Sequence, residues 1–149
     1  VIVPMGGGGL ISGIATAIKE TRPSVRVVGV EPALTPKYFH SRINKERTSL
    51  PLKNTIADGL RISVPGQNPY PIIERYVDEI VLVEDEHIVA GMRMLAKDAK
   101  LIAEPAASIG IGALLASGLK VEPQEKVCVV LTGGNWDLCD LAEVFQRGN

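Results

Sequence analysis

The stretch VIVPMGGGGLISGIATAIKE (1–20) decides the fold. A short β-branched run, 1–3, leads into four consecutive glycines at residues 6–9, which we call the tetraglycine loop. Apolar residues with helical spacing follow over 10–21, and a second apolar run, RVVGVE (26–31), stops at a proline. The order strand, glycine turn, helix, strand predicts a βαβ unit, whose parallel strands are buried on both faces.

The rest of the chain continues this alternation. Apolar runs predict strands at 78–83 and 126–131. Helices are predicted at 71–76, 85–99 and 105–116, with a short helix after the second strand and a final amphipathic helix that includes Phe145. We expect Asp85 to cap the helix at 85–99, Gly110 and Gly112 to allow close packing, and the charges at 84–87 to face solvent. The predicted fold class is α/β, a single domain over 1–149 with a mainly parallel sheet flanked by helices.

Composition and charge exclude several classes of protein. The 149 residues include 16 basic and 17 acidic side chains without a basic stripe, so nothing favours a nucleic-acid partner. No apolar run reaches the roughly 18 residues that a membrane span needs, and no signal peptide is recognisable. Two cysteines are too few for a disulfide scaffold and indicate free thiols in a reducing compartment. We therefore expect a cytoplasmic protein without a membrane partner.

The tetraglycine loop needs a reason beyond chain reversal, because one or two glycines suffice for a tight turn. It follows the carboxyl end of a strand and leads into a helix N-terminus, where backbone N–H groups have no intrahelical partner. Without side chains in the way, these N–H groups can converge on a phosphate. The sequence therefore predicts an anion site here. A second glycine-rich segment, the TGGN turn (residues 132–135), follows the last predicted strand.

Several phosphate ligands are compatible with such a loop. A dinucleotide is one alternative, with Glu31 at the end of the second strand as a ribose ligand, but the glycine after Gly7 and Gly9 is Gly13, not the spacing G-x-G-x-x-G. A P-loop requires G-K-[ST] after the glycines, and residues 10–12 read LIS instead. A dinucleotide-binding oxidoreductase domain and a non-catalytic phosphate-binding module both remain alternatives at this point.

Four segments carry a family resemblance: VPMGGGGLISG (3–13), TIADGL (55–60), LIAEPAAS (101–108) and LTGGN (131–135). In this order they resemble the second half of the fold-type II pyridoxal-phosphate (PLP) enzymes, closest to the threonine dehydratase and serine racemase family. The resemblance implies pyridoxal 5′-phosphate as cofactor, threonine or serine as substrate and a homo-oligomeric parent. It also implies an ammonia-lyase that eliminates the β-hydroxyl to give a 2-oxo acid and ammonia, with serine racemase as the alternative.

The resemblance also implies roles by position. The cofactor-binding residues it implies are Gly6, Gly7, Gly8, Gly9, Leu10, Gly59, Glu104, Thr132, Gly133 and Asn135. The tetraglycine loop would hold the phosphate, and Thr132 would place its hydroxyl against the pyridine nitrogen. Gly59 and Glu104 would lie near the ring, and Asn135 would hold the turn and cap the last helix. A hydroxyl cannot pair with a protonated ring as a carboxylate can, which suits elimination.

The chemistry also requires a lysine that binds PLP covalently. In the family this lysine lies in a serine-x-lysine-x-arginine-glycine motif that precedes the tetraglycine loop, and no lysine of this chain has that context. We therefore assign no catalytic residue here. The chain is expected to be the C-terminal fragment of a longer enzyme, inactive by itself.

A divalent-metal site is not expected. Serine racemases carry one after the second strand, as a glutamate, a backbone carbonyl four residues later and an aspartate six residues later. Glu31 and Thr35 fit this pattern, but Lys37 replaces the aspartate, and its charge opposes cation binding. We expect the Lys37 side chain to point into solvent, with a position beside Glu31 as the alternative. His40 and His87 lack metal-ligand spacing and are expected to face solvent.

Overall fold

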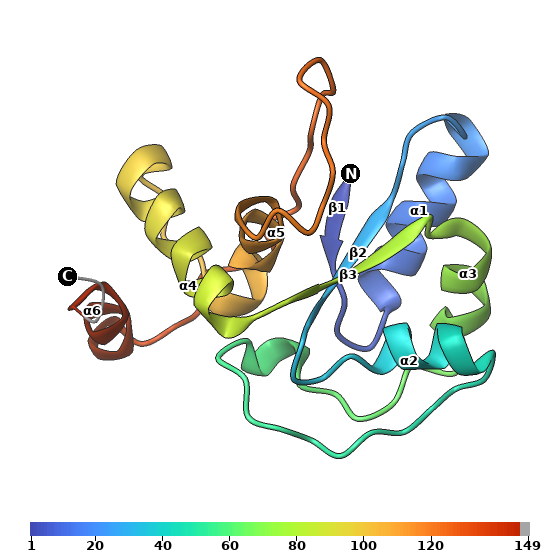
Figure 1. The fold of residues 1–149 in the computed structure, drawn as a ribbon, viewed down its shortest axis with the longest axis horizontal. Helices are drawn as coiled ribbons and strands as arrows, with labels where there is room; N and C mark the ends of the chain where they lie inside the picture. Colours follow the sequence, from blue (N-terminus) through green and yellow to red (C-terminus); the bar gives the residue numbers. More distant parts are fainter. Residues whose placement is uncertain (147–149) are drawn as a thin grey trace.

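A three-stranded parallel sheet forms the centre of the computed structural model, which describes residues 1–146. Its strands are β1 (Ile2–Pro4), β2 (Val28–Pro32) and β3 (Glu79–Val83), in the order β1-β2-β3. The register pairs Ile2 with Val28, and Val28 with Glu79. Strands this rich in valine and isoleucine suit a sheet that is buried on both faces. The predicted α/β fold with a parallel sheet is confirmed (Figure 1).

Helices cover both faces of the sheet. They are α1 (Gly9–Thr21), α2 (Lys37–Asn44), α3 (Pro69–Tyr76), α4 (Asp85–Met94), α5 (Pro105–Leu115) and α6 (Leu138–Gln146), with a 3₁₀ turn, η1 (Asp58–Leu60), and a π-helical turn, η2 (Leu95–Ala99), that continues α4. Figure 1 shows α1 and α3 on one side of the sheet and α5 on the other, with α4 outside α5. None of the helices in residues 1–146 has the length and hydrophobicity of a membrane span.

Each face of the sheet buries its own aliphatic core, because successive strand residues point to opposite faces. The core beneath α1 and α3 contains Val3, Met5, Ile11, Ala15, Val27, Tyr38, Ile73, Val77 and Ile80. The core beneath α5 contains Ile2, Val28, Val30, Val81, Val83, Ile88, Ile109 and Ala113 among others. The strand β1 therefore lies between two packed layers, which fixes the position of the tetraglycine loop that follows it.

Glycines allow α5 to pack closely, as the sequence predicts. A β-carbon added at Gly112 would lie 2.8 Å from the carbonyl oxygen of His87 on α4. One added at Gly110 would lie 2.5 Å from Cγ1 of Val129. Real β-carbons do not approach other atoms this closely, so both positions require glycine.

The predicted strand at 126–131 is wrong. Only a single parallel bridge joins Ile2 to Val129, through hydrogen bonds from Ile2 N–H to Cys128 O (2.8 Å) and from Val130 N–H to Ile2 O (3.0 Å). The next ladder bond on this side of β1 would need the N–H of residue 4, which is Pro4 and has none. The bridge nevertheless aligns residues 128–130 with β1, so the TGGN turn follows at the same edge as the tetraglycine loop.

Candidate active site

A pocket of about 240 Å³ opens where β1 ends. It is lined by Pro4, Gly6, Gly7, Gly8, Gly9, Leu10, Gly59, Leu60, Glu104, Ala106 and Thr132. Four separate segments thus meet in one pocket, and it includes every predicted cofactor-binding residue except Gly133 and Asn135. A hollow of similar volume at the amino end of the strands, around Arg26 and Lys126, contains none of the predicted residues.

Among the four glycines, Gly8 is the one whose backbone excludes other residues. Its φ of 94° lies in the left-handed region, and an added β-carbon would lie 2.0 Å from the Tyr38 hydroxyl oxygen and 2.8 Å from Cδ1 of Ile73. An added β-carbon at Gly7 or Gly9 would have no atom within 4 Å. Gly8 is therefore required by packing beneath the loop, whereas Gly7 and Gly9 leave space at the pocket.

The Tyr38 hydroxyl supports the loop from below. It donates to the carbonyl of Gly7 at 2.7 Å, and the N–H of Gly66 lies 3.2 Å from the hydroxyl oxygen and 3.1 Å from the same carbonyl. Burial raises the pKa of Tyr38 to about 12, although the N–H of Gly66 acts in the opposite direction. The hydroxyl therefore keeps its proton at neutral pH and remains a donor to the loop.

The loop has the donors that a phosphate needs. Within residues 1–146, the N–H groups of the tetraglycine loop donate no hydrogen bond to another protein group. The carbonyl of Gly8 accepts from Ser12 N–H at 3.0 Å, so the loop runs directly into the first turn of α1. N–H groups without protein partners, at the positive end of a helix and beside a pocket, fit a phosphate ester.

The opposite wall of the pocket is formed by Glu104 and the TGGN turn. The N–H of Glu104, the residue before α5, donates to the carbonyl of Gly133 at 3.1 Å. A β-carbon at Gly133 would lie 3.1 Å from Oε1 of Glu104, so the absence of a side chain there makes room for the carboxylate. Thr132 is exposed and lines the pocket together with the tetraglycine loop, as the sequence requires if both contact one small ligand.

Asn135 does not cap the last helix. Helix α6 begins at Leu138, and the carboxylate of Asp137 accepts the N–H of Cys139 at 2.7 Å. A capping side chain must come from the residue that flanks the first helical one, and Asn135 lies too far upstream. Asn135 is exposed and does not line the pocket.

Asp85 holds the segment that carries Gly59, a role that the sequence does not signal. It is the first residue of α4 and not its cap, and its carboxylate accepts the Thr55 hydroxyl at 2.6 Å and the Ile56 N–H at 2.9 Å. These bonds fix the start of the run that continues into η1 and reaches the pocket at Gly59.

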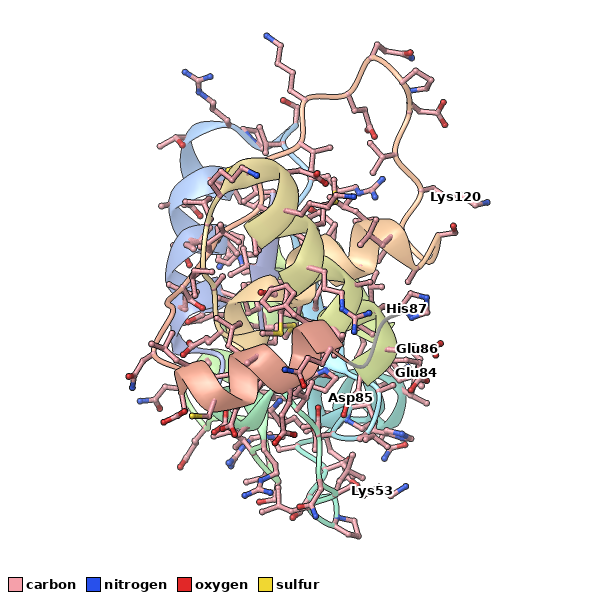
Figure 2. All side chains as sticks on the ribbon, turned by 90° about the vertical axis from the view of Figure 1, so that its left-hand side faces the viewer. Lys53, Glu84, Asp85, Glu86, His87 and Lys120 are labelled. Carbon is pink, nitrogen blue, oxygen red and sulfur yellow. The ribbon has the colours of Figure 1, made fainter. Side chains whose placement is uncertain are left out.

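The other charged residues at the start of α4 take no part in the pocket. Figure 2 shows Glu84, Asp85, Glu86 and His87 together there. Glu84 and Glu86 are exposed, as predicted. His87 is only partly exposed, and its Nδ1 is buried without a hydrogen-bond partner, so its predicted solvent-facing position is wrong. The reason is that α5 packs against the backbone of His87 at Gly112. His40 is exposed, as expected.

Lys37 is the larger correction, because it does not point into solvent. Its side chain is fully buried, with Nζ 2.9 Å from Oε1 of Glu31 and 2.9 Å from the carbonyl oxygen of Met5. The other carboxylate oxygen of Glu31 accepts the N–H of Phe39 at 2.9 Å. Glu31 is thus consumed by internal partners and cannot bind a ribose, which removes the main support for a dinucleotide. No group of three or more acidic, histidine or cysteine side chains in residues 1–146 could hold a metal ion.

Comparison with known proteins gives a consistent set of relatives. Residues 1–133 match the family described as "Pyridoxal-phosphate dependent enzyme". The chain is 43% identical over 148 residues to the L-threonine ammonia-lyase of Geobacter sulfurreducens, covering 99% of this chain and 37% of that protein. It is 37% identical over 150 residues to the serine racemase of Arabidopsis thaliana, covering 98% and 45%.

Solved structures agree with the sequence relatives. A bacterial threonine deaminase, from the organism abbreviated T.th., superposes with a TM-score of 0.87 at 34% identity, over 92% of this chain and 49% of that one. Maize serine racemase superposes with a TM-score of 0.87 at 35% identity, over 98% and 45%. The chain spans less than half the length of each of these relatives.

Proposed function

Because the chain belongs to the pyridoxal-phosphate dependent enzyme family, we propose that its pocket is the phosphate and ring-nitrogen side of the PLP site in a threonine or serine ammonia-lyase. The observation that carries the proposal is one small pocket that contains both the tetraglycine loop and Thr132. A relative named L-threonine ammonia-lyase, 43% identical over nearly the whole chain, supports the reaction class.

Each wall of the pocket has a separate task in this proposal. The N–H groups of the tetraglycine loop bind the phosphate ester, and the dipole of α1 adds to their attraction. The Thr132 hydroxyl donates to the ring nitrogen, while Glu104 and Gly59 flank the ring. PLP, when bound, supplies an electron sink for the substrate's α-carbon. Thr132 is neutral and offers no carboxylate to pair with a ring proton, so the ring remains uncharged and favours loss of the β-hydroxyl.

The covalent lysine is proposed to come from outside these 149 residues. None of the residues that line the described pocket is a lysine, and Lys37 is buried beneath the loop. The chain alone is therefore expected to bind cofactor weakly and to have no lyase activity. A cytoplasmic, homo-oligomeric parent enzyme remains a prediction of the same proposal.

A serine racemase is the second candidate, supported by the 37% identity to the Arabidopsis enzyme over 98% of this chain. Both reactions begin with loss of the α-proton, so the pocket residues serve either one. An enzyme that contains this chain, assayed with L-threonine and L-serine, separates the two candidates. The lyase forms 2-oxobutyrate and pyruvate, whereas the racemase accumulates D-serine.

Binding to the chain itself tests the cofactor site. Pyridoxine 5′-phosphate has no aldehyde, so it cannot react with surface lysines. Calorimetric titration should show that it binds at least about tenfold more tightly than pyridoxine, because only the phosphate ester can use the loop's charge-assisted hydrogen bonds. Equal affinity for the two compounds would contradict the proposed phosphate site.

Borohydride reduction in the presence of PLP tests the missing lysine. Mass spectrometry of the treated chain should show only scattered, substoichiometric labelling. A stoichiometric adduct on one lysine would show that the chain carries its own covalent site, and it would overturn the view that this lysine lies elsewhere.

A further inference from the structure

A fully buried ion pair lies directly beneath the tetraglycine loop. Lys37 and Glu31 have no exposed surface, and the Lys37 ammonium bonds both the Glu31 carboxylate and the Met5 carbonyl. Glu31 also accepts the N–H groups of Tyr38 at 3.1 Å and Phe39 at 2.9 Å. A buried ion pair is costly unless its remaining bonding capacity is used, and here nearly all of it is. The pair thus joins the start of α2 rigidly to the residue before the loop.

Two successive side chains of α2 reach two carbonyls of the loop region. Lys37 Nζ lies 2.9 Å from the Met5 carbonyl oxygen, and the Tyr38 hydroxyl lies 2.7 Å from that of Gly7. All peptide bonds in the described chain are trans, so each carbonyl points opposite to the N–H of the next residue. Holding these two carbonyls against α2 therefore turns the N–H groups of Gly6 and Gly8 away from it.

We propose that Lys37 and Tyr38 are positioning residues that hold the tetraglycine loop in its phosphate-binding conformation. We call the two side chains the α2 brace. The brace acts through the backbone, because Lys37 is fully buried and does not line the pocket. Only the identity of the phosphate ester rests on the proposed PLP function. The aim of the loop's N–H groups follows from the contacts of this chain alone.

The chemistry of both side chains suits this task. An ammonium has three donors and no acceptor, so it can satisfy a carboxylate and a carbonyl at once. An apolar side chain at position 37 would leave both the Glu31 carboxylate and the Met5 carbonyl without this donor. At position 38, phenylalanine would keep the ring but lose the donor to Gly7. The brace is thus separable, by substitution, from the packing of α2.

Loop conformation is the first measurement, and it needs no ligand. Tyr38→Phe removes only the hydroxyl, and the double variant Glu31→Gln/Lys37→Met removes both charges without leaving one buried alone. We expect the amide ¹H–¹⁵N signals of Gly6 and Gly8 to shift in both variants. Their hydrogen exchange should accelerate about tenfold, while amides of β3 exchange at the unmodified rate.

The matched controls carry the same chemical changes elsewhere. Tyr76→Phe removes a tyrosine hydroxyl that bonds Glu20 at the surface, and Lys19→Met removes a lysine that is paired with Asp78. Neither should move the Gly6 and Gly8 signals. If both brace variants also leave these signals and their exchange unchanged, the proposal is wrong, and Tyr38→Phe alone decides the matter should the double variant not fold.

Phosphate selectivity is the second measurement. In Tyr38→Phe and in the double variant, affinity for pyridoxine 5′-phosphate should fall about tenfold while affinity for pyridoxine stays within about twofold. Loss of affinity for both compounds alike would indicate general damage and contradict a role in positioning the loop. If the unmodified chain does not bind pyridoxine 5′-phosphate, the proposed function fails, and the amide measurements still decide whether the brace exists.

Discussion

The hydroxyl oxygen of Tyr38 occupies the place where a side chain at Gly8 would begin, because an added β-carbon would lie 2.0 Å from it. Gly8 also has a left-handed backbone, with φ of 94°. We therefore predict that Gly8→Ala destabilises the chain by about 2–3 kcal/mol, through strain and displacement of Tyr38. Urea unfolding followed by circular dichroism measures the change.

Two other glycines serve as controls for this prediction. A β-carbon at Gly7 meets no atom within 4 Å, so Gly7→Ala should change stability by no more than about 0.5 kcal/mol. Gly13 is exposed within α1, and Gly13→Ala should stabilise by about 0.5–1 kcal/mol because alanine favours the helix. Equal destabilisation by all three substitutions would show that crowding beneath Gly8 is not the cause.

Thr132 should recognise a ring nitrogen through its hydroxyl. Thr132→Val keeps the shape but loses the donor, and we expect affinity for pyridoxine 5′-phosphate to fall about fivefold, the effect of one neutral hydrogen bond. Thr132→Ser should retain the affinity. An analogue with a C–H in place of the ring nitrogen should bind the unmodified chain and Thr132→Val equally. A fivefold difference that persists with this analogue would assign the effect to packing instead.

Asp78 should make stability depend on acid. Burial alone would raise the pKa of Asp78, but hydrogen bonds from Lys19 and the Val27 N–H outweigh it and hold the pKa below its ordinary value. A lowered folded-state pKa gives stability that is complete above about pH 4 and is lost as pH falls through that pKa.

Asp78→Asn should therefore be less stable at pH 7 and should lose less stability on acidification than the unmodified chain. Urea unfolding between pH 7 and about pH 2.5 provides the measurement. Glu79→Gln is the neighbouring control, because Glu79 forms only an exposed ion pair with Arg26 at 3.6 Å. The same flattening of the pH dependence in Glu79→Gln would argue against a specific role for Asp78.

Asp85 should stabilise the segment that leads to Gly59. Asp85→Ala removes the acceptor of the Thr55 hydroxyl and the Ile56 N–H, and we expect a loss of about 1–3 kcal/mol. Glu86→Ala is the matched control, since it removes another carboxylate from the same first turn of α4. It should cost no more than about 0.5 kcal/mol. Hydrogen exchange over residues 55–60 should rise only in Asp85→Ala.

The regular elements could be predicted because their signals are local. Apolar spacing in 10–21 and 85–99 gave α1 and α4 with η2, and the two strands around α1 followed from short valine-rich runs. The residues that meet in the pocket also followed from sequence, because turns after parallel strands gather at one edge. The strand at 126–131 failed on a remote fact, namely that its partner strand places a proline where the ladder needs a donor.

Lys37 and Asp85 could not be predicted for a related reason. Each is a charged residue at the start of a helix, where exposure is the usual outcome. Lys37 is buried because Glu31 and the carbonyl of Met5, 32 positions earlier, meet its ammonium. Asp85 finds its partners at Thr55 and Ile56, about 30 positions earlier. Such partners become visible only once the fold has brought them together.

The single bridge between Ile2 and Val129 implies an order of assembly for the pocket. The tetraglycine loop belongs to a βαβ unit whose contacts are close in sequence, whereas Thr132 joins it across about 120 residues. Closing so long a segment carries an entropic cost, and few backbone hydrogen bonds offset it. We therefore expect the phosphate wall to form early in folding and the ring-nitrogen wall to close late and to reopen first. Cofactor captured by the first wall would then act as a template on which the second one settles.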